Sequence, residues 1–278
     1  MADIEVRQLQ SHAEYLACVE LQKAIWGDEF TECVPATILK VAQRIGGVTA
    51  GAFDGEGRLL GFVFGMTGVE DGRLVHWSDI LAVREDMRGH GVGRHLKEFQ
   101  RAVLRRHGVC VVYWTYDPLV ARNAHLNLNR LGARVIEYVP DMYGDTKSEL
   151  HSGLGTDRFI VAWRIAEDPG AGTHDGKAAP PPAEYRRAPV VNRVGSAATQ
   201  REVEVSPGEG LRLLRIAIPL DIHAVRVAAP AVAAEWRSST RTAFLQLLGE
   251  GYHVAGFYRD PTAGQGFYVL SLGSPAGT

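Results

Sequence analysis

The feature that most constrains this chain is a run of alternating glycines in the middle of its sequence. Gly89, Gly91 and Gly93 lie between an apolar stretch at 74–83, predicted as a strand, and the start of an amphipathic helix. Glycines weaken a helix start, but they let a ligand approach the unpaired N–H groups and the positive dipole end found there. We therefore predict that residues 88–94 bind the pyrophosphate of a coenzyme.

The spacing after this loop predicts a helix followed by a parallel strand. The apolar face of the helix is predicted to hold Val92, Leu96, Phe99 and Val103. The polar face is predicted to hold Arg94, Lys97, Glu98, Arg101 and Arg105. Residues 110–116 are almost continuously apolar, as in a buried strand, and a strand, helix and buried strand in succession indicate a crossover with parallel pairing.

The residues before the loop alternate in ways that predict strands and two helices. Ser11 and Glu14 form a capping-box pattern, which predicts a helix start with Leu16 and Val19 on its inner face. A second helix is predicted at 36–45. The predicted antiparallel strands cover 4–9, 48–54, 59–68 and 74–83, with turn signals between the last three.

The residues after 116 complete one domain and begin another. A helix is predicted at 119–130 and strands at 133–139 and 158–166. These elements close a predicted domain at 1–167. The Gly-, Ala- and Pro-rich stretch 168–183 is predicted as a linker. Residues 184–278 then predict a small β-α-β-β unit, an interaction or lid domain that we expect to contribute to a homodimer contact.

The predicted fold class is α+β, a mixed α/β arrangement. It has a mixed, mostly antiparallel central sheet flanked by helices, with the small C-terminal unit appended. Two common phosphate loops do not fit the sequence. A P-loop needs Gly-Lys-Ser/Thr at its end, and the dinucleotide pattern G-x-G-x-x-G needs glycine where Arg94 stands.

What remains is R-x-x-G-x-G, formed by Arg88, Gly91 and Gly93 after the strand residues 81–83. This motif, together with the order of elements over roughly residues 3–166, resembles the GNAT superfamily of N-acetyltransferases. Residues 114–124 and 143–158 resemble a branch of predicted acetyltransferases within it. The resemblance implies a GNAT fold and acetyl-CoA as acyl donor.

The resemblance also implies roles for individual residues toward the coenzyme. Backbone groups of Leu81 and Val83 would pair with the pantetheine and acetyl groups in a gap between splayed strands. The pyrophosphate would be bound by the loop residues Arg88, Gly89, Gly91, Val92, Gly93 and Arg94. Asn123 matches an asparagine that contacts the coenzyme from the following helix; its alternative role is a helix N-cap.

The catalytic groups depart from the family pattern. The glutamate expected before the loop falls near Trp77, so Asp79 is the predicted general base, with His76 on the opposite strand face. The expected tyrosine acid falls at Leu128, so Tyr143 is the predicted general acid and Tyr116 its alternative.

The acceptor is predicted to be a small-molecule amine near the polar loop 141–156. The acidic residues expected to favour a cationic amine are Asp141, Asp145, Glu149 and Asp157. Direct transfer of an acetyl group to this amine is the predicted activity. The alternative is a non-catalytic acyl-CoA sensor or interaction module on the same fold, which the absent glutamate and Leu128 would explain.

The composition limits the kinds of partner that we expect for this chain. A net charge of -2 with scattered arginines predicts no nucleic-acid partner. Three irregularly spaced cysteines indicate neither a disulfide framework nor a metal site. The charged N-terminus lacks a signal-peptide pattern, and no apolar run reaches the roughly 20 residues of a membrane span. We expect a cytoplasmic protein that does not bind membranes.

Overall fold

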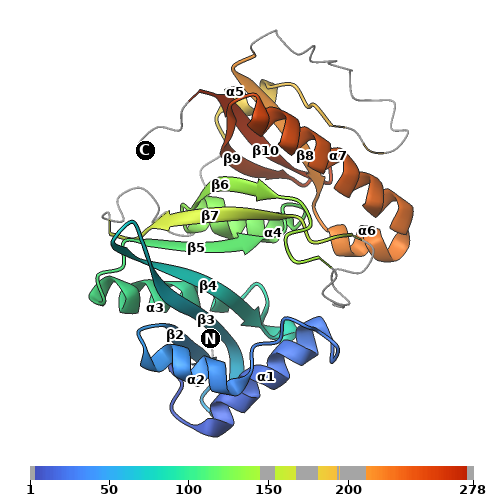
Figure 1. Ribbon diagram of the computed structural model, residues 1–278. Helices are drawn as coiled ribbons and strands as arrows, with labels where there is room; N and C mark the ends of the chain where they lie inside the picture. The colour runs from blue at the N-terminus through green and yellow to red at the C-terminus, as the bar shows by residue number, and fades with distance from the viewer. Residues whose placement is uncertain (1–3, 145–153, 167–180, 193, 195–210, 274–278) are drawn as a thin grey trace. The chain divides into compact units, whose positions relative to one another are not determined.

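The computed structural model describes residues 4–144, 154–166, 181–192, 194 and 211–273 (Figure 1). Most of the predicted linker and the middle of the polar loop, with Asp145 and Glu149, lie outside these residues. Within them, the predicted elements up to the final strand of the first domain are present, with ends shifted by a few residues.

The elements up to the glycine loop are two helices and four strands, with a single 3-10 turn before the loop. They are β1 (Glu5–Gln8), α1 (His12–Trp26), α2 (Ala36–Arg44), β2 (Val48–Phe53), β3 (Leu59–Glu70), β4 (Arg73–Val83) and η1 (Glu85–Met87). The following elements of the central sheet and its helices are α3 (Val92–Arg106), β5 (Val111–Tyr116), α4 (Ala121–Ala124), the π-helical η2 (His125–Arg130), β6 (Arg134–Val139) and β7 (Arg158–Arg164).

The central sheet has seven strands in the order β1-β2-β3-β4-β5-β7-β6. Strands β1 to β4 pair antiparallel in sequence order, as the meander predicts. Strand β5 pairs parallel to β4 after the α3 crossover. The sheet is therefore mixed and mostly antiparallel, which confirms the predicted fold class, and its arrangement is GNAT-like.

The first helix begins as the sequence predicts but buries a different face. The Ser11 hydroxyl accepts from the Glu14 N–H, and the Glu14 carboxylate accepts from the Ser11 N–H, so the capping box is confirmed. Leu16, predicted to face inward, is 47% exposed. The buried side chains of α1 are instead Tyr15, Cys18 and Leu21, together with the polar Gln22.

Strand β4 contains one residue more than β3 at the centre of their pairing. Ile80 pairs with Phe64 and Trp77 with Met66, so two residues of β4 lie opposite Gly65. This is a β-bulge, which bends a strand and redirects its side chains. Gly65 has no room for a side chain: an added Cβ would lie 2.3 Å from His76 Nε2 and 2.4 Å from the Trp77 carbonyl oxygen. The bulge therefore requires glycine on the facing strand.

The C-terminal region forms a separate three-stranded sheet in the order β8-β10-β9. Its elements are α5 (Ala183–Arg187), β8 (Leu213–Pro219), α6 (Ile222–Ala228), α7 (Pro230–Gly249), β9 (Tyr252–Asp260) and β10 (Gln265–Leu272). The predicted strand, helix and hairpin are present. The predicted helix is α7, which begins at Pro230. An additional helix that was not predicted, α6, precedes it and ends where Ala229 leaves the helical conformation.

The described chain divides into two compact units. The first comprises residues up to Thr115 together with 162–166. The second comprises Tyr116–Gly144, 154–161 and the described residues from 181 onward. This division does not follow the predicted domains 1–167 and 184–278, because it groups the end of β5, α4, β6 and most of β7 with the C-terminal region.

A cluster of aromatic rings explains this grouping. Phe244 of α7 is fully buried, and its ring centroid lies 4.7 Å from Phe159 of β7 and 5.3 Å from Tyr138 of β6. Tyr268 of β10 also packs on Phe159, and its hydroxyl donates to the Pro118 carbonyl at 2.8 Å. The second unit therefore has one core, built from residues far apart in sequence.

We expect Gly65→Ala to lower the free energy of unfolding by about 1–3 kcal/mol, the usual effect of overpacking. Gly68→Ala, in the same strand, is the matched control because an added Cβ meets no atom within 4 Å. Denaturant unfolding of both variants measures the difference. Equal stability of the two variants would contradict the tight fit at the bulge.

We expect Phe244→Ala to cost about 3–5 kcal/mol, since it empties the centre of an aromatic core. Leu245→Ala is the control, because the neighbouring side chain is 47% exposed and should change stability by less than about 1 kcal/mol. Thermal unfolding monitored by near-UV circular dichroism reports on the aromatic core. If Leu245→Ala lowers the unfolding temperature as much as Phe244→Ala does, then the aromatic cluster around Phe244 is not the core of the second unit.

Candidate coenzyme site

The glycine loop leaves the start of α3 open to an anion. Gly89 has φ +85° and Gly91 φ +84°, both in the left-handed region that glycine tolerates. Gly91 is the N-cap residue, and no side chain caps the helix. The first-turn N–H groups, from Val92, Gly93 and Arg94, have no partners within a helix. These donors and the helix dipole favour a phosphate.

The loop brings the predicted coenzyme residues of β4 and α3 together. A Cβ added to Gly93 would lie 3.6 Å from Leu81 Cδ2 and 3.8 Å from Val83 Cγ2, so the helix begins against the end of β4. Arg88 pairs with Glu85 and Arg94 with Glu98, and all four side chains are at least partly exposed. Such exposed pairs are weak, so both guanidinium groups can turn toward an anion.

Strands β4 and β5 pair over only part of their length. Their parallel register joins Val75–Trp77 to Val111–Tyr113, and β4 continues beyond it to Val83. We call the point after Trp77 and Tyr113 the sheet fork. The residue that follows on each strand is Ser78 and Trp114, and the bulge of β4 lies at the same place. The parallel pairing of β4 and β5 therefore stops before either strand ends.

Asp79 and His76 lie on opposite faces of β4, as the alternation predicts. His76 is fully buried, whereas Asp79 is exposed. Nearby protein nevertheless limits the hydration of the Asp79 carboxyl, and this desolvation raises its pKa above the usual value; a hydrogen bond from Trp77 opposes the shift and the charge of Glu32 adds to it. Asp79 is therefore a reachable carboxylate that holds a proton more tightly than usual.

Lys97 was predicted on the polar face of α3, and this prediction is wrong. Its side chain is 2% exposed. The ammonium donates to Ser78 Oγ at 2.7 Å and lies 4.0 Å from the centre of the Trp114 ring. Burial lowers the pKa of Lys97 to about 7. The helical spacing missed this residue because a lysine can reach sideways around a helix to a polar partner.

A chain of buried polar groups continues from Lys97 along β4. Gln100 Oε1 accepts from Lys97 at 3.5 Å, and Gln100 Nε2 lies 3.1 Å from His76 Nε2. His76 Nδ1 lies 3.0 Å from Thr67 Oγ1, which donates to the Gly46 carbonyl at 2.7 Å. Because Thr67 uses its proton on Gly46, His76 must donate from Nδ1 and accept at Nε2.

This chain of contacts requires a neutral His76. Desolvation, with the positive charges of Lys97 and His107, lowers the pKa of His76 to about 3. A neutral imidazole can accept at Nε2 from the Gln100 amide, and this fixes the Gln100 oxygen toward Lys97. His76 is thus a structural partner on the helix side of the sheet, and Asp79 is the titratable group on the accessible side.

The remaining predicted site residues lie in the second unit. Tyr143 is half-buried, and the Arg158 guanidinium lies 5.3 Å from the centre of its ring. Tyr116 is buried, and its hydroxyl oxygen lies 3.4 Å from the hydroxyl oxygen of Tyr268. Burial raises the pKa of Tyr116 far above its usual value. Tyr116 is therefore a poor proton donor, which leaves Tyr143 as the tyrosine candidate.

Asn123 and Leu128 lie on the short helical segment after β5. Val120, and not Asn123, is the N-cap of α4, so the N-cap interpretation of Asn123 is wrong. The Asn123 side chain is partly exposed and remains a candidate coenzyme contact. Leu128 lies in the π-helical turn η2.

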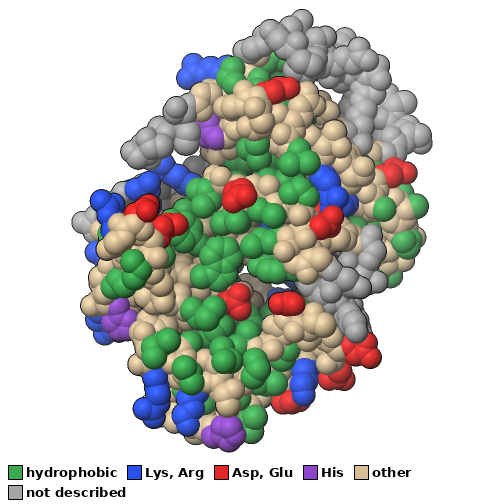
Figure 2. All heavy atoms as spheres, in the orientation of Figure 1, with side chains coloured by type: hydrophobic (Ala, Val, Ile, Leu, Met, Phe, Trp, Pro, Cys, Tyr) green, Lys and Arg blue, Asp and Glu red, His purple; other side chains and the backbone are tan. Residues whose placement is uncertain are grey.

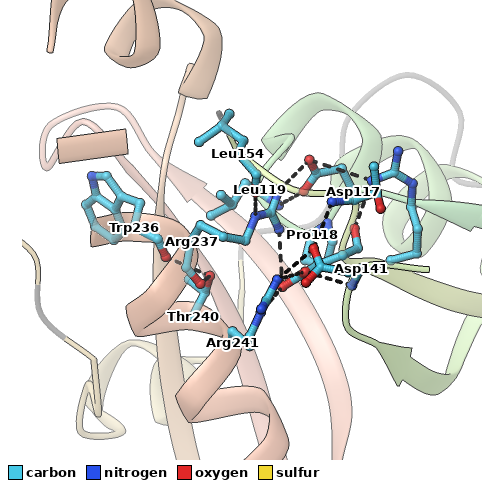
Figure 3. Close-up of polar contacts among 12 residues, drawn as sticks. Asp117, Pro118, Leu119, Asp141, Leu154, Trp236, Arg237, Thr240 and Arg241 are labelled. Atoms are coloured by element: carbon cyan, nitrogen blue, oxygen red, sulfur yellow. Dashed lines mark hydrogen bonds and ion pairs between the residues drawn. The ribbon is translucent and has the colours of Figure 1, made fainter. Parts of the chain in front are cut away.

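Two of the acidic residues expected to attract an amine are paired with arginines of α7 (Figure 3). Arg241 binds both Asp157 and Asp141, the latter at 3.0 Å. Arg237 donates to Asp117 Oδ2 at 2.6 Å and to the Leu154 carbonyl at 2.8 Å. Tyr138 also donates to Asp157. Both carboxylates are paired with arginines of α7, so the structure lends no support to the expectation that Asp141 and Asp157 attract a cationic acceptor, which stays a prediction.

The described residues contain no cluster of three or more His, Cys, Asp or Glu side chains that could hold a metal ion. None of their helices is long and apolar enough to cross a membrane. On the face drawn in Figure 2, basic and acidic side chains are interspersed, in keeping with the net charge of -2.

Comparison with known proteins gives matches at the level of structure. No family model matches the sequence, and no curated protein matches it. The ribosomal-protein-S18-alanine N-acetyltransferase of Escherichia coli is similar at 17% identity and a TM-score of 0.46, over 62% of this chain and 100% of that one. The yncA protein of Salmonella typhimurium, solved with its cofactor acetyl-CoA, is similar at 18% identity and a TM-score of 0.46, with the same coverage. Ard1 of Thermoplasma volcanium is similar at 14% identity and a TM-score of 0.46, over 59% of this chain and 99% of that one.

These matches leave a C-terminal region of the present chain outside the shared part. At such low identity and TM-score they say nothing about activity or acceptor. The assignment of the fold rests instead on the strand order, the parallel β4–β5 pair and the glycine loop before α3. On those features, the fold of this chain is GNAT-like, with an additional C-terminal region.

Proposed function

We propose that the protein is an acetyl-CoA-dependent N-acetyltransferase that transfers the acetyl group directly to a small-molecule amine. The observation that carries this proposal is the start of α3. Its first-turn N–H groups have no side-chain cap, two left-handed glycines precede them, and the end of β4 lies beside them. An anionic group at the end of a long arm fits such a site.

The chain supplies two kinds of group toward the coenzyme. The N–H groups of the loop and the exposed guanidinium groups of Arg88 and Arg94 would hold the pyrophosphate. Beyond the sheet fork, backbone groups of Leu81 and Val83 would hold the pantetheine arm, because this part of β4 lies outside its parallel register with β5. Acetyl-CoA supplies the activated acyl group when it is bound.

Asp79 is the group that we assign to deprotonating the acceptor. An amine acceptor is an ammonium ion at neutral pH and must lose a proton before its nitrogen can attack. The Asp79 carboxyl is exposed, and its raised pKa makes it a stronger base than an ordinary aspartate. We expect the acceptor to approach from this face of β4, on which the charge of Glu32 also acts.

The helix start can be tested by adding a negative charge. Gly93→Asp places a carboxylate in the first turn, where it stabilises the helix dipole and has ordinary van der Waals space. We expect acetyl-CoA affinity to fall more than about tenfold, by competition for the same N–H groups, while thermal stability is kept. Isothermal titration calorimetry measures the affinity.

Thr37→Asp is the matched control, since Thr37 is exposed at the same second position of α2. It should leave acetyl-CoA affinity unchanged. If the wild-type protein binds no acetyl-CoA at millimolar concentration, or if both variants bind alike, the proposed coenzyme site is wrong.

Asp79→Asn tests the general base. We expect kcat to fall by about 100-fold or more, as is usual when a general base is removed. The pKa of Asp79 is raised, so wild-type kcat/KM should rise as pH increases through that pKa, and the variant should lose this rise. Asp71→Asn, in the exposed turn between β3 and β4, is the control.

Release of free CoA over a panel of amines measures both quantities. If Asp79→Asn keeps the wild-type pH profile, then Asp79 is not the base. If wild-type protein binds acetyl-CoA and releases no CoA with any amine, the alternative of a non-catalytic acyl-CoA sensor replaces the proposal.

A further inference from the structure

Lys97 lies at the sheet fork, between the two strands that part there. Its Nζ atom is 2.7 Å from the hydroxyl of Ser78, the residue after the last paired position of β4. The same atom is 4.0 Å from the ring centre of Trp114, the residue after the last paired position of β5. The Lys97 amine therefore contacts the first residue beyond the parallel pairing on each of the two strands, β4 and β5.

This amine is costly to bury. Among the described residues no carboxylate lies within ion-pair distance of Lys97, so its desolvation is offset only by hydrogen bonds and by the face of Trp114. A methionine of similar length could fill the same space without that cost. A buried polar group that lowers the stability of the folded protein, with no compensating gain in packing or pairing, is typical of a functional site.

Ser78 is a proton donor at the same point. Its oxygen accepts from Lys97, and within the described part of the chain we find no acceptor for the proton of the Ser78 hydroxyl itself. The side chain is only 4% exposed, so water competes little for this proton. Lys97 and Ser78 thus form a directed pair, with the free donor at the fork.

The neighbouring polar chain keeps this pair in one orientation. Gln100 Oε1 lies 3.5 Å from Lys97, and His76 holds the Gln100 amide so that its oxygen faces the amine. Thr67 in turn holds His76. A lysine positioned in this way, with a pKa near neutrality, can both hold and give up a proton.

We propose that Lys97 holds, and Ser78 delivers, the proton that the sulfur of the leaving CoA takes up. This rests on the proposed function and gives to Lys97 and Ser78 the general-acid role for which Tyr143 is the candidate from the sequence. As the acceptor nitrogen forms its bond to the acyl carbon, the carbon–sulfur bond breaks and its electron pair goes to sulfur. Ser78 passes its hydroxyl proton to that sulfur and takes one from Lys97 Nζ. Lys97, left as an amine, regains a proton from solvent, which balances the proton released through Asp79.

The test varies how much the leaving sulfur needs a proton. Wild-type protein, Lys97→Met and Ser78→Ala are compared with acetyl-CoA and with the acetyl thioester of 4-nitrothiophenol, whose thiol is acidic enough to leave unprotonated. Hydroxylamine is the nucleophile, because it is uncharged at neutral pH and needs no general base. Thr49→Val is the matched control, because it removes a buried hydroxyl of β2 that donates to the Leu39 carbonyl and lies outside this polar chain.

With acetyl-CoA we expect both variants to lose about 100-fold in kcat, a typical general-acid contribution. With the aryl thioester we expect a loss of less than about threefold, since a good leaving group needs little acid catalysis. Acetyl-CoA affinity by calorimetry should stay within about threefold of wild type, because the proton is needed in the transition state only. Lys97→Met should unfold at the wild-type temperature or above it, and Ser78→Ala repeats the test if Lys97→Met does not fold.

Equal losses with both thioesters, or loss of affinity in place of kcat, would overturn the proton-delivery proposal and leave the proposed function intact. Wild-type protein that binds acetyl-CoA but releases no CoA to hydroxylamine or to any amine of the panel would also overturn it, in favour of the sensor. Wild-type protein that binds no acetyl-CoA would remove the proposed function and this inference together.

Discussion

The structure depends on the extra residue that β4 inserts opposite Gly65. Because the facing strand has no side chain there, β4 can bulge toward it without breaking the pairing on either side. The parallel pairing with β5 extends only to Trp77, the residue before the bulge. The bulge also places Ser78 against α3 and leaves Asp79 on the accessible face. One backbone irregularity thus organises both faces of the candidate site.

The two faces differ in their physical chemistry. On the accessible face, desolvation and the charge of Glu32 raise the pKa of Asp79, so its carboxylate can act as a base. On the helix face, desolvation keeps His76 neutral, and burial lowers the pKa of Lys97 to about 7, so that this side chain can hold or give up a proton. Groups of opposite character on two sides of one strand are suited to removing a proton on one side and returning one on the other.

Much of this fold could be predicted from the sequence, because periodicity and turn residues act locally. The capping box at Ser11, the meander, the α3 crossover and the final hairpin follow from such local patterns. The bulge could not be predicted, since an added residue leaves no periodic trace. Helical spacing puts Lys97 on the exposed face of α3, because spacing cannot show that a buried partner such as Ser78 is available to a polar side chain.

The candidate coenzyme loop was predictable for the same local reason, whereas the acidic residues were not. The acidic composition of residues 141–157 suggests an exposed surface on which Asp141 and Asp157 are unpaired. Their partner, Arg241, lies far along the chain, and only tertiary packing brings these charges together. Long-range packing of this kind also explains why the two compact units differ from the domains predicted at 1–167 and 184–278. Helix α7 completes a core that begins at the end of β5.

That shared core has a consequence for biosynthesis. Phe159 and Tyr138 leave the ribosome well before Phe244 and Tyr268, the rings that cover them. Contacts so distant in sequence form slowly, and the early segment exposes apolar surface until the last helix and hairpin are made. The second unit must therefore fold after translation is nearly complete, and a nascent chain stalled before α7 would be a natural client for chaperones.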